Sequence, residues 1–228
     1  MTRPTIGLVI PCFNEEDAIA VLLEEIPLEQ VDRVFVVDNG STDDTARTAA
    51  ASGATVIHEP RKGYGWACWS GFQAVREAGL DVTAFCDGDR SDDPRDLPRL
   101  LGPLQEGRAD LVLGRRIIEP GALSAQAVWG NAFACFILRA FFRIPVHDLP
   151  SMKVIRTAHL EELDLQDRTY GWTLEMIIRS GRRGLKLMEL PIHYRQRIGV
   201  SKVSGTLSGT LRASCRILST LITHALRR

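Results

Sequence analysis

Short apolar runs rich in β-branched residues recur through the first half of the chain, and helix-compatible segments separate them. Such runs predict buried strands, and strands that alternate with helices predict a mainly parallel sheet. The predicted strands are residues 5–11, 33–37, 54–57, 82–86 and 110–114. The predicted helices are residues 15–26, 42–51, 65–78 and 95–105, with Ser41, Thr42 and Asp43 able to cap the second. The pattern indicates an α/β fold.

The second half of the chain is less regular. We predict helices at residues 122–142 and 172–180, a loop and strand at 147–156, and one or two strands at 185–194. From about residue 203, apolar side chains recur near helical spacing, which predicts a C-terminal amphipathic helix; they are Leu207, Leu211, Cys215, Leu218 and Ile222. No uncharged stretch reaches the roughly 18 to 20 residues of a membrane-spanning helix, because Arg139 interrupts the best candidate.

Charge is divided unevenly although the net charge is zero. Residues 1–114 hold 10 Lys and Arg against 20 Asp and Glu, whereas residues 115–228 hold 18 against 8. Clustered cations raise the local concentration of phosphates or acidic lipids, so the second half is suited to an anionic partner. A dipolar surface without a partner is the alternative.

The cysteines and the N-terminus narrow the class of protein. The five cysteines are scattered and form no CxxC pair, which argues against a disulfide framework and against a thiolate zinc site. Residues 1–4 run into an apolar segment without a cleavage region, and we therefore expect a cytosolic protein.

Polar clusters follow several predicted strands, and in a parallel sheet such clusters converge on one crevice. Asp87-Gly88-Asp89 is the central one, because two carboxylates at a strand end can hold a hard divalent cation against a diphosphate. We expect Asp89 to be an exposed turn residue. An isolated Asp-x-Asp is more often an ordinary acidic turn, so the neighbouring motifs decide between the two interpretations.

Three further clusters fit a nucleotide. Asp38 and Asn39 stand where they could bond a nucleobase, and Glu15 could contact a ribose or base. Arg61 and Lys62 precede a predicted helix N-terminus, a combination suited to diphosphate. Simple turns, compensation of a helix dipole and a solvated loop are the alternatives.

Taken in order, these motifs resemble the family 2 glycosyltransferases. They are Ile10-Pro11-Cys12-Phe13-Asn14-Glu15-Glu16, Val37-Asp38-Asn39-Gly40-Ser41-Thr42-Asp43, Arg61-Lys62-Gly63-Tyr64-Gly65 and Asp87-Gly88-Asp89. The similarity continues through Gly114-Arg115-Arg116, Asp148-Leu149-Pro150-Ser151, Tyr170-Gly171-Trp172 with Glu175, and Arg197-Ile198-Gly199-Val200-Ser201-Lys202. That pattern resembles the branch of polyprenyl-phosphate (dolichyl-phosphate) mannose and glucose synthases.

The resemblance implies a glycosyltransferase A-type, Rossmann-like sheet with flanking helices and a C-terminal helical extension. It implies a catalytic domain at residues 1–202, with a nucleotide-sugar half at 1–114 and an acceptor half at 115–202, followed by the helix at 203–228. The implied reaction moves a hexose with inversion from a UDP- or GDP-hexose to a polyprenyl phosphate, with Mg²⁺ or Mn²⁺ as cofactor.

Residue roles carry over from the motifs. The nucleotide sugar would be bound by Pro11, Phe13, Glu15, Asp38, Asn39, Lys62, Asp87 and Gly88, and the metal by Asp87 and Asp89. Catalytic roles would fall to Asp89, Asp148 and Arg115, and the acceptor phosphate to Arg116, Arg197, Ser201 and Lys202. The chain departs from the family pattern at Ser91, often Gln, and at Ser151-Met152-Lys153, commonly Ser-Gly-Phe.

The acceptor decides whether the enzyme needs a base. A lipid phosphate is largely dianionic at neutral pH and can attack the sugar unaided, whereas a hydroxyl acceptor would need Asp148 or Glu175 as base. No Glu-Asp pair follows Asp148, which favours the phosphate. A nucleotidyltransferase and a non-catalytic nucleotide-sugar-binding protein are further alternatives, although the first strand lacks the Gly-rich loop that nucleotidyl transfer commonly uses.

Location follows from the same features. We expect a peripheral protein on the cytosolic membrane face, touching lipid through the C-terminal helix and through residues 122–142. Packing of these helices on the sheet, or a homodimer interface, is the alternative. We expect no nucleic-acid partner.

Overall fold

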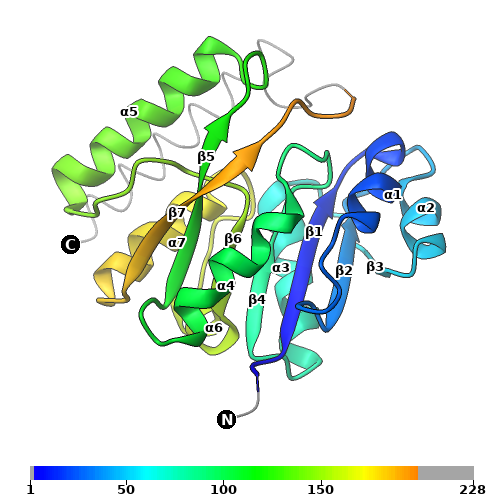
Figure 1. The fold of residues 1–228 in the computed structure, drawn as a ribbon, viewed down its shortest axis with the longest axis horizontal. Helices are drawn as coiled ribbons and strands as arrows, with labels where there is room; N and C mark the ends of the chain where they lie inside the picture. Colours follow the sequence, from blue (N-terminus) through cyan, green and yellow to red (C-terminus); the bar gives the residue numbers. More distant parts are fainter. Residues whose placement is uncertain (1–2, 200–228) are drawn as a thin grey trace.

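Strands and helices alternate along residues 3–199, the part of the chain that the computed structural model describes (Figure 1). The strands are β1 (Ile6–Cys12), β2 (Arg33–Asp38), β3 (Thr55–His58), β4 (Val82–Phe85), β5 (Leu111–Ile118), β6 (Lys153–Arg156) and β7 (Leu187–Tyr194). The helices are α1 (Glu16–Glu24), α2 (Thr45–Ala51), α3 (Tyr64–Glu77), α4 (Leu97–Gln105), α5 (Ala125–Phe142), α6 (Thr157–Leu163) and α7 (Trp172–Arg182), and a short 3-10 helix η1 (Pro94–Asp96) precedes α4. The predicted C-terminal helix lies outside the described residues.

The seven strands form one sheet in the order β3-β2-β1-β4-β6-β5-β7. All neighbours are parallel except β6, which is antiparallel to both β4 and β5. The predicted α/β class and mainly parallel sheet are confirmed. Because β1, β2 and β4 are parallel neighbours, the loops after their carboxyl ends meet at one edge of the sheet.

Side-chain alternation along the strands builds two hydrophobic clusters, one on each face. In β1, Ile6, Leu8 and Ile10 join the cluster that contains residues of α1 and α4. Val9 points the other way and joins the cluster with residues of α3 and α7. Helices therefore cover both faces, as Figure 1 shows, and the rigid sheet fixes the loops at its edge.

Local hydrogen bonds move some element boundaries from their predicted places. Helix α2 begins at Thr45 rather than at residue 42, because Asp43 Oδ1 accepts the N–H of Thr45 and forms a turn there. Helix α5 begins after Ser124, whose hydroxyl accepts the N–H of Ala127 at 3.3 Å. Strand β5 is longer than predicted, because β7 pairs with it along its whole length.

Helix α5 keeps much of its apolar surface in contact with solvent. Trp129 is 77% exposed, and Phe133, Phe136 and Phe141 are also exposed. Helix α5 is long and apolar enough to cross a membrane. Core helices of soluble proteins can be equally long and apolar, but they are mostly buried, whereas only 17% of α5 is buried. Only one side of α5, with Ala134, Cys135 and Leu138, is buried against the rest of the protein. Packing, the alternative to membrane contact, therefore does not explain the exposed aromatic side.

Candidate active site

Asp89 lies at the centre of a bonded cluster after β4. Its Oδ1 accepts the N–H of Ser91 at 2.9 Å and the Ser91 hydroxyl at 2.5 Å, while its Oδ2 forms an ion pair with Nη2 of Arg197. Asp89 is only 5% exposed, so the expectation of an exposed turn residue was wrong. The tight turn folds back on its own carboxylate, which fixes the direction of that group.

Asp87 and Asp92 bring two more carboxyls to the same loop. Asp92 Oδ2 accepts the N–H of Asp87 at 3.3 Å. Burial, together with the negative charge of Asp89, raises the pKa of Asp87 to about 7 and that of Asp92 to about 6. Each also has a buried Oδ1 with no hydrogen-bond partner within residues 3–199.

These oxygens fit a divalent cation. An unpaired buried carboxylate oxygen is unfavourable unless a proton, a hydrogen-bond donor or a cation satisfies it, and hard carboxylate oxygens are the ligands that Mg²⁺ and Mn²⁺ accept. Among the described residues, no group of three or more His, Cys, Asp and Glu side chains is arranged to hold a metal. A site with only two protein carboxylates, such as the predicted pair Asp87 and Asp89, would leave positions on the ion for substrate phosphate oxygens, which is the usual mode for Mg²⁺.

Gly88 allows the loop after β4 to approach the end of β1 closely. A Cβ at this position would clash with Sγ of Cys12 and lie 3.3 Å from the carbonyl oxygen of Pro11. Gly88 and Pro11 thus fix the distance between the loop that carries Asp87 and Asp89 and the end of β1.

The side chains predicted to bind the nucleoside lie after β1 and β2. Asp38 Oδ1 accepts the N–H of Ser41 at 2.9 Å, and Oδ2 lies 3.3 Å from Nδ1 of His58. Glu15 is buried, and its backbone N–H donates to the hydroxyl of Thr45 at 2.8 Å. The two predicted carboxylates therefore belong to one edge of the sheet.

Asn39 plays a different part from the one predicted. Its amide nitrogen donates to the carbonyls of Glu59 and Arg61, at 3.0 and 2.7 Å, and its Oδ1 accepts the N–H of Gly63 at 2.8 Å. Both amide hydrogens are used, so neither can be donated to a nucleobase. We reassign Asn39 to support of the loop at residues 59–63.

Lys62, predicted to bind the nucleotide sugar, contacts the loops that follow β1 and β2. Its Nζ donates to the carbonyl of Gly40 at 2.6 Å and lies 4.0 Å from the ring centroid of Phe13. Lys62 thus joins the loops after β1, β2 and β3 at the place where a nucleotide would meet them.

Two N–H groups in the first turn of α3, the predicted diphosphate site, are already engaged within the protein. Those of Gly65 and Trp66 donate to the carbonyls of Thr169 and Arg168. Arg61 is also engaged, because Glu59 accepts two hydrogen bonds from its guanidinium. A side chain at Gly65 would overlap the Arg168 backbone, so the glycine permits this contact.

The predicted base candidates are both engaged in ion pairs. Asp148 is buried and bonds the guanidinium of Arg116 at two points, and Arg116 is thereby tied to a protein carboxylate. Glu175 is 2% exposed and accepts the N–H groups of Gln166 and Asp167 at 2.9 and 2.6 Å. The predictions of Glu175 as a base and Arg116 as a free phosphate ligand do not fit these contacts.

The remaining predicted cations divide into three cases. Arg115 is exposed on β5, next to the partly buried Arg116. Arg197 reaches the centre of the site, where it contacts Asp89 and lies 3.8 Å from Oε1 of Glu15. Ser201 and Lys202 lie outside the described residues.

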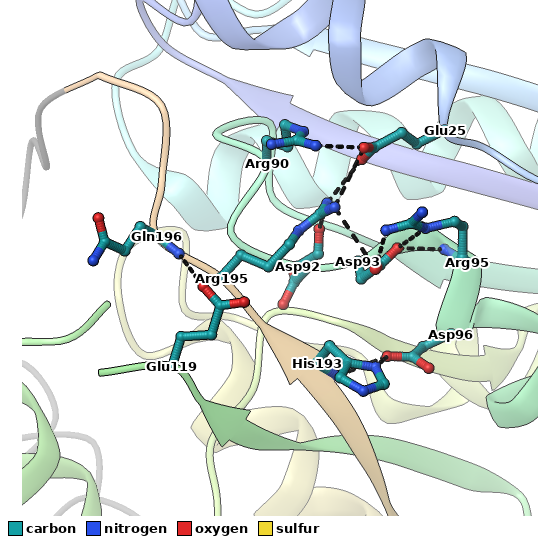
Figure 2. A network of polar contacts seen from close by, with 10 residues as sticks. All are labelled: Glu25, Arg90, Asp92, Asp93, Arg95, Asp96, Glu119, His193, Arg195 and Gln196. Atoms are coloured by element: carbon teal, nitrogen blue, oxygen red, sulfur yellow. Dashed lines mark hydrogen bonds and ion pairs between the residues drawn. The ribbon is translucent and has the colours of Figure 1, made fainter. Parts of the chain in front are cut away.

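Sequence reasoning missed a partly buried network that ties the end of β7 to the loop after β4 (Figure 2). Glu25 of the α1 C-terminus accepts hydrogen bonds from Arg195 at 2.8 Å and from Arg90 at 2.6 Å. Arg195 also donates to the carbonyl of Asp92 at 3.0 Å. The sequence offered only a weak signal, two arginines in a basic run near the end of β7.

A buried lysine is the second missed feature. Lys153 is fully buried on β6, donates to the carbonyl of Ser151 at 2.7 Å and lies 5.2 Å from the ring centroid of Phe85. Burial lowers its pKa, while the charges of Asp87 and Asp92 act in the opposite direction. Lys153 thus lies behind the acidic loop, the segment after β4 that carries Asp87, Asp89 and Asp92. The family pattern commonly has Phe at the position of Lys153.

Known proteins share this arrangement of sequence and fold. Residues 8–159 match the family model described as glycosyl transferase family 2. An uncharacterized glycosyltransferase of Mycobacterium tuberculosis is 41% identical over 93% of this chain and 96% of its own length. The undecaprenyl-phosphate mannosyltransferase of Micrococcus luteus is 30% identical over 88% of both chains.

A solved structure matches the fold as well. Glucosyl-3-phosphoglycerate synthase from Mycobacterium tuberculosis, in complex with Mn²⁺, UDP and glucosyl-3-phosphoglycerate, has a TM-score of 0.81 at 27% identity, covering 97% of this chain and 80% of that chain. From the family model that matches most of its length and from these similarities, the chain belongs to glycosyl transferase family 2.

Proposed function

We propose that this protein is an inverting, metal-dependent hexosyltransferase that uses a UDP- or GDP-hexose and transfers the sugar to a polyprenyl phosphate. The observation that carries the proposal is the pair Asp87 and Asp89 at the carboxyl end of β4, where one buried oxygen of Asp87 lacks a partner in the described structure and a cation would supply one. The Micrococcus relative, named for transfer to undecaprenyl phosphate, supports the lipid acceptor.

The donor would lie across the loops that follow β1, β2 and β4. Asp38 and Glu15 would bind the nucleoside, and Lys62 would meet the phosphates. Asp87 and Asp89 would hold Mg²⁺ or Mn²⁺, which supplies neutralisation of the negative charge that develops on the leaving nucleoside diphosphate. Mn²⁺ with UDP in the glucosyl-3-phosphoglycerate synthase complex supports this choice of ligands.

The state of the carboxylates favours an acceptor that needs no base. Asp148 is held at both oxygens by Arg116, and Glu175 is buried under backbone N–H groups and Arg179. A carboxylate engaged in this way is poorly placed to take a proton from a hydroxyl. A phosphate monoester is already ionised at neutral pH and could attack the anomeric carbon directly.

A second candidate acceptor is a small phosphorylated hydroxy acid. The solved structure with a TM-score of 0.81 is of an enzyme crystallised with glucosyl-3-phosphoglycerate. In that alternative the acceptor is again anionic, but the attacking group is a hydroxyl rather than the phosphate.

A lipid acceptor requires contact with a membrane, and α5 offers a suitable surface. Residues 120–147 contain no Asp or Glu, and they include Arg139 and Arg143 beside the exposed aromatic residues of α5. Aromatic side chains with basic neighbours suit an anionic lipid surface. We propose that α5, together with the C-terminal segment 203–228, attaches the enzyme to the cytosolic membrane face; a homodimer through α5 is the alternative.

A product assay tests the function. The purified protein is incubated with Mn²⁺ and radiolabelled UDP-glucose, UDP-galactose or GDP-mannose, each with undecaprenyl phosphate, dolichyl phosphate, 3-phosphoglycerate or no acceptor. We expect label in the butanol-extractable lipid for one donor, and none with Asp89→Asn. Label only in water-soluble 3-phosphoglycerate product would replace the lipid acceptor by the second candidate, and donor hydrolysis without transfer would contradict both.

A further inference from the structure

Arg197 and a divalent ion would bind the same oxygen of Asp89. Oδ1 of Asp89 already accepts two hydrogen bonds from Ser91, and Oδ2 is in contact with Nη2 of Arg197. A metal ion at Oδ2 would lie within a few ångström of the guanidinium, and like charges at that range repel strongly in a buried site. Arg197 as it lies here and a metal ion on Oδ2 therefore exclude each other.

We propose that Arg197 competes with the divalent ion for Asp89, and that it moves from this carboxylate to the donor diphosphate when ion and nucleotide bind together. The identity of the donor rests on the proposed function. The competition itself does not depend on which acceptor the enzyme uses.

Two atoms of the site support this exchange. Nε of Arg197 is a buried donor, and Oδ1 of Asp87 a buried acceptor, and neither has a hydrogen-bond partner in the described part of the chain. A phosphate oxygen could accept from Nε, and a divalent ion could bind Oδ1. One ligand, the metal complex of a nucleoside diphosphate, would thus satisfy both atoms.

The surrounding structure permits the side chain to move while the backbone stays. The N–H of Ile198 donates to the carbonyl of Asp89 at 3.0 Å, and the N–H of Arg195 donates to that of Ser91 at 2.8 Å. The Arg195 guanidinium is fixed by Glu25, as Figure 2 shows. The Arg197 side chain, by contrast, is 28% exposed and has Glu15 as a neighbouring carboxylate at 3.8 Å.

Competition at Asp89 makes metal and nucleotide binding interdependent. Without nucleotide, the ion must displace Arg197 into a position with fewer partners, so it binds weakly. With nucleotide, the diphosphate accepts the hydrogen bonds of Arg197 and Asp89 becomes available. Each ligand therefore strengthens the binding of the other by the same factor.

Mn²⁺ binding, followed by the electron paramagnetic resonance signal of the free ion, tests the proposal without any transfer reaction. In the absence of nucleotide, Arg197→Ala should bind Mn²⁺ about five- to tenfold more tightly than wild type, because Asp89 no longer has a competing partner. With saturating UDP the order should reverse, because the variant lacks the cation that meets the diphosphate. Arg197→Lys should lie between the two proteins under both conditions.

Three controls separate competition from other causes. Arg108→Ala removes one positive charge from an exposed residue that pairs with Glu106, and it should bind Mn²⁺ like wild type. If Arg108→Ala tightened Mn²⁺ binding equally, net charge would explain the effect and the proposal would fail.

In an Asp89→Asn background, Arg197→Ala should no longer change the affinity for Mn²⁺. A change that persisted there would overturn the proposal. Far-ultraviolet circular dichroism checks that each variant is folded.

Unchanged or weaker Mn²⁺ binding by Arg197→Ala without nucleotide would also overturn the proposal, since it would mean that Arg197 orients Asp89 for the metal instead of competing with it. Because no acceptor is present, loss of the lipid-phosphate hypothesis would leave this result untouched. Failure of the exchange would likewise leave the identity of the acceptor open to the product assay.

Discussion

The carboxylate of Asp148 bonds the guanidinium of Arg116 at two points, with Oδ1 2.6 Å from Nη2 and Oδ2 2.9 Å from Nε. Oδ2 also accepts the backbone N–H of Arg116 at 2.8 Å. Asp148 lies in the loop before β6 and Arg116 on β5, so the pair fastens that loop to the sheet. Asp148, expected to act as a base, and Arg116, expected to bind the acceptor phosphate, thus bind each other and stabilise the fold.

Breaking this buried pair should destabilise the protein. Asp148→Asn or Arg116→Met should each lower the free energy of unfolding by about 3 kcal/mol, because each leaves an opposite charge buried without its partner. The double variant should lose clearly less than the sum of the two. Urea denaturation of the four proteins measures the coupling, and strictly additive losses would show that the pair does not act as a unit.

Asp89→Asn should separate metal binding from folding. The substitution keeps the shape and one oxygen that can accept from Ser91, but removes the charge that a divalent ion needs. Transfer should fall by at least about a hundredfold, and the stabilisation that Mn²⁺ with UDP gives in a thermal shift should be lost. Wild-type transfer that persisted in EDTA would contradict a metal-dependent enzyme.

Gly88→Ala should disrupt the contact between β4 and β1, because the new methyl group would clash with Sγ of Cys12. We expect a loss of about 1–3 kcal/mol in unfolding free energy, together with weaker nucleotide binding. Adding Cys12→Ala removes the clashing atom and should recover much of the binding. Gly102→Ala in α4 is the matched control, since a Cβ there meets nothing within 4 Å and should leave stability equal or higher. Equal losses at both glycines would exclude the steric explanation.

Glu59 should contribute stability that disappears in acid. Its hydrogen bonds from Arg61 and Ser70 lower the pKa of the buried Glu59 carboxyl to about 2. A lowered pKa in the folded state means that the stabilisation is fully present above the unfolded pKa of about 4.5 and is lost as the pH falls through about 2. The Tm difference between wild type and Glu59→Gln should therefore be largest above pH 5 and shrink towards pH 2. A pH-independent difference would contradict this origin.

The apolar surface of α5 should bind anionic vesicles. Replacing Trp129 and Phe133 by Ser should weaken co-sedimentation with vesicles of phosphatidylglycerol and phosphatidylcholine, and high salt should weaken it further by screening Arg139 and Arg143. Leu28→Ser is the matched control, because Leu28 is an exposed apolar residue of the loop before β2. Loss of a dimer in analytical ultracentrifugation, without any change in vesicle binding, would favour the homodimer instead.

The sequence by itself determined the alternation of strands and helices and the position of Asp87, Gly88 and Asp89 directly after a strand. Both depend on local patterns, because hydrophobic period and turn residues act within a few positions of one another. Parallel neighbours then bring the loops after β1, β2 and β4 to one edge, so the convergence of these loops, where we propose the nucleotide site, also followed from the sequence.

Only the tertiary structure decided which charges meet. Nothing local in the sequence indicates that Arg197 contacts Asp89, that Arg116 contacts Asp148, or that Glu25 joins Arg90 to Arg195. Nor does it show that β6 enters the sheet in the antiparallel direction between β4 and β5, bringing Lys153 behind the acidic loop. An arginine has the same appearance in a sequence whatever its partner, and the partner is fixed by strand order and by burial, which make an unpaired charge too unfavourable to leave in place.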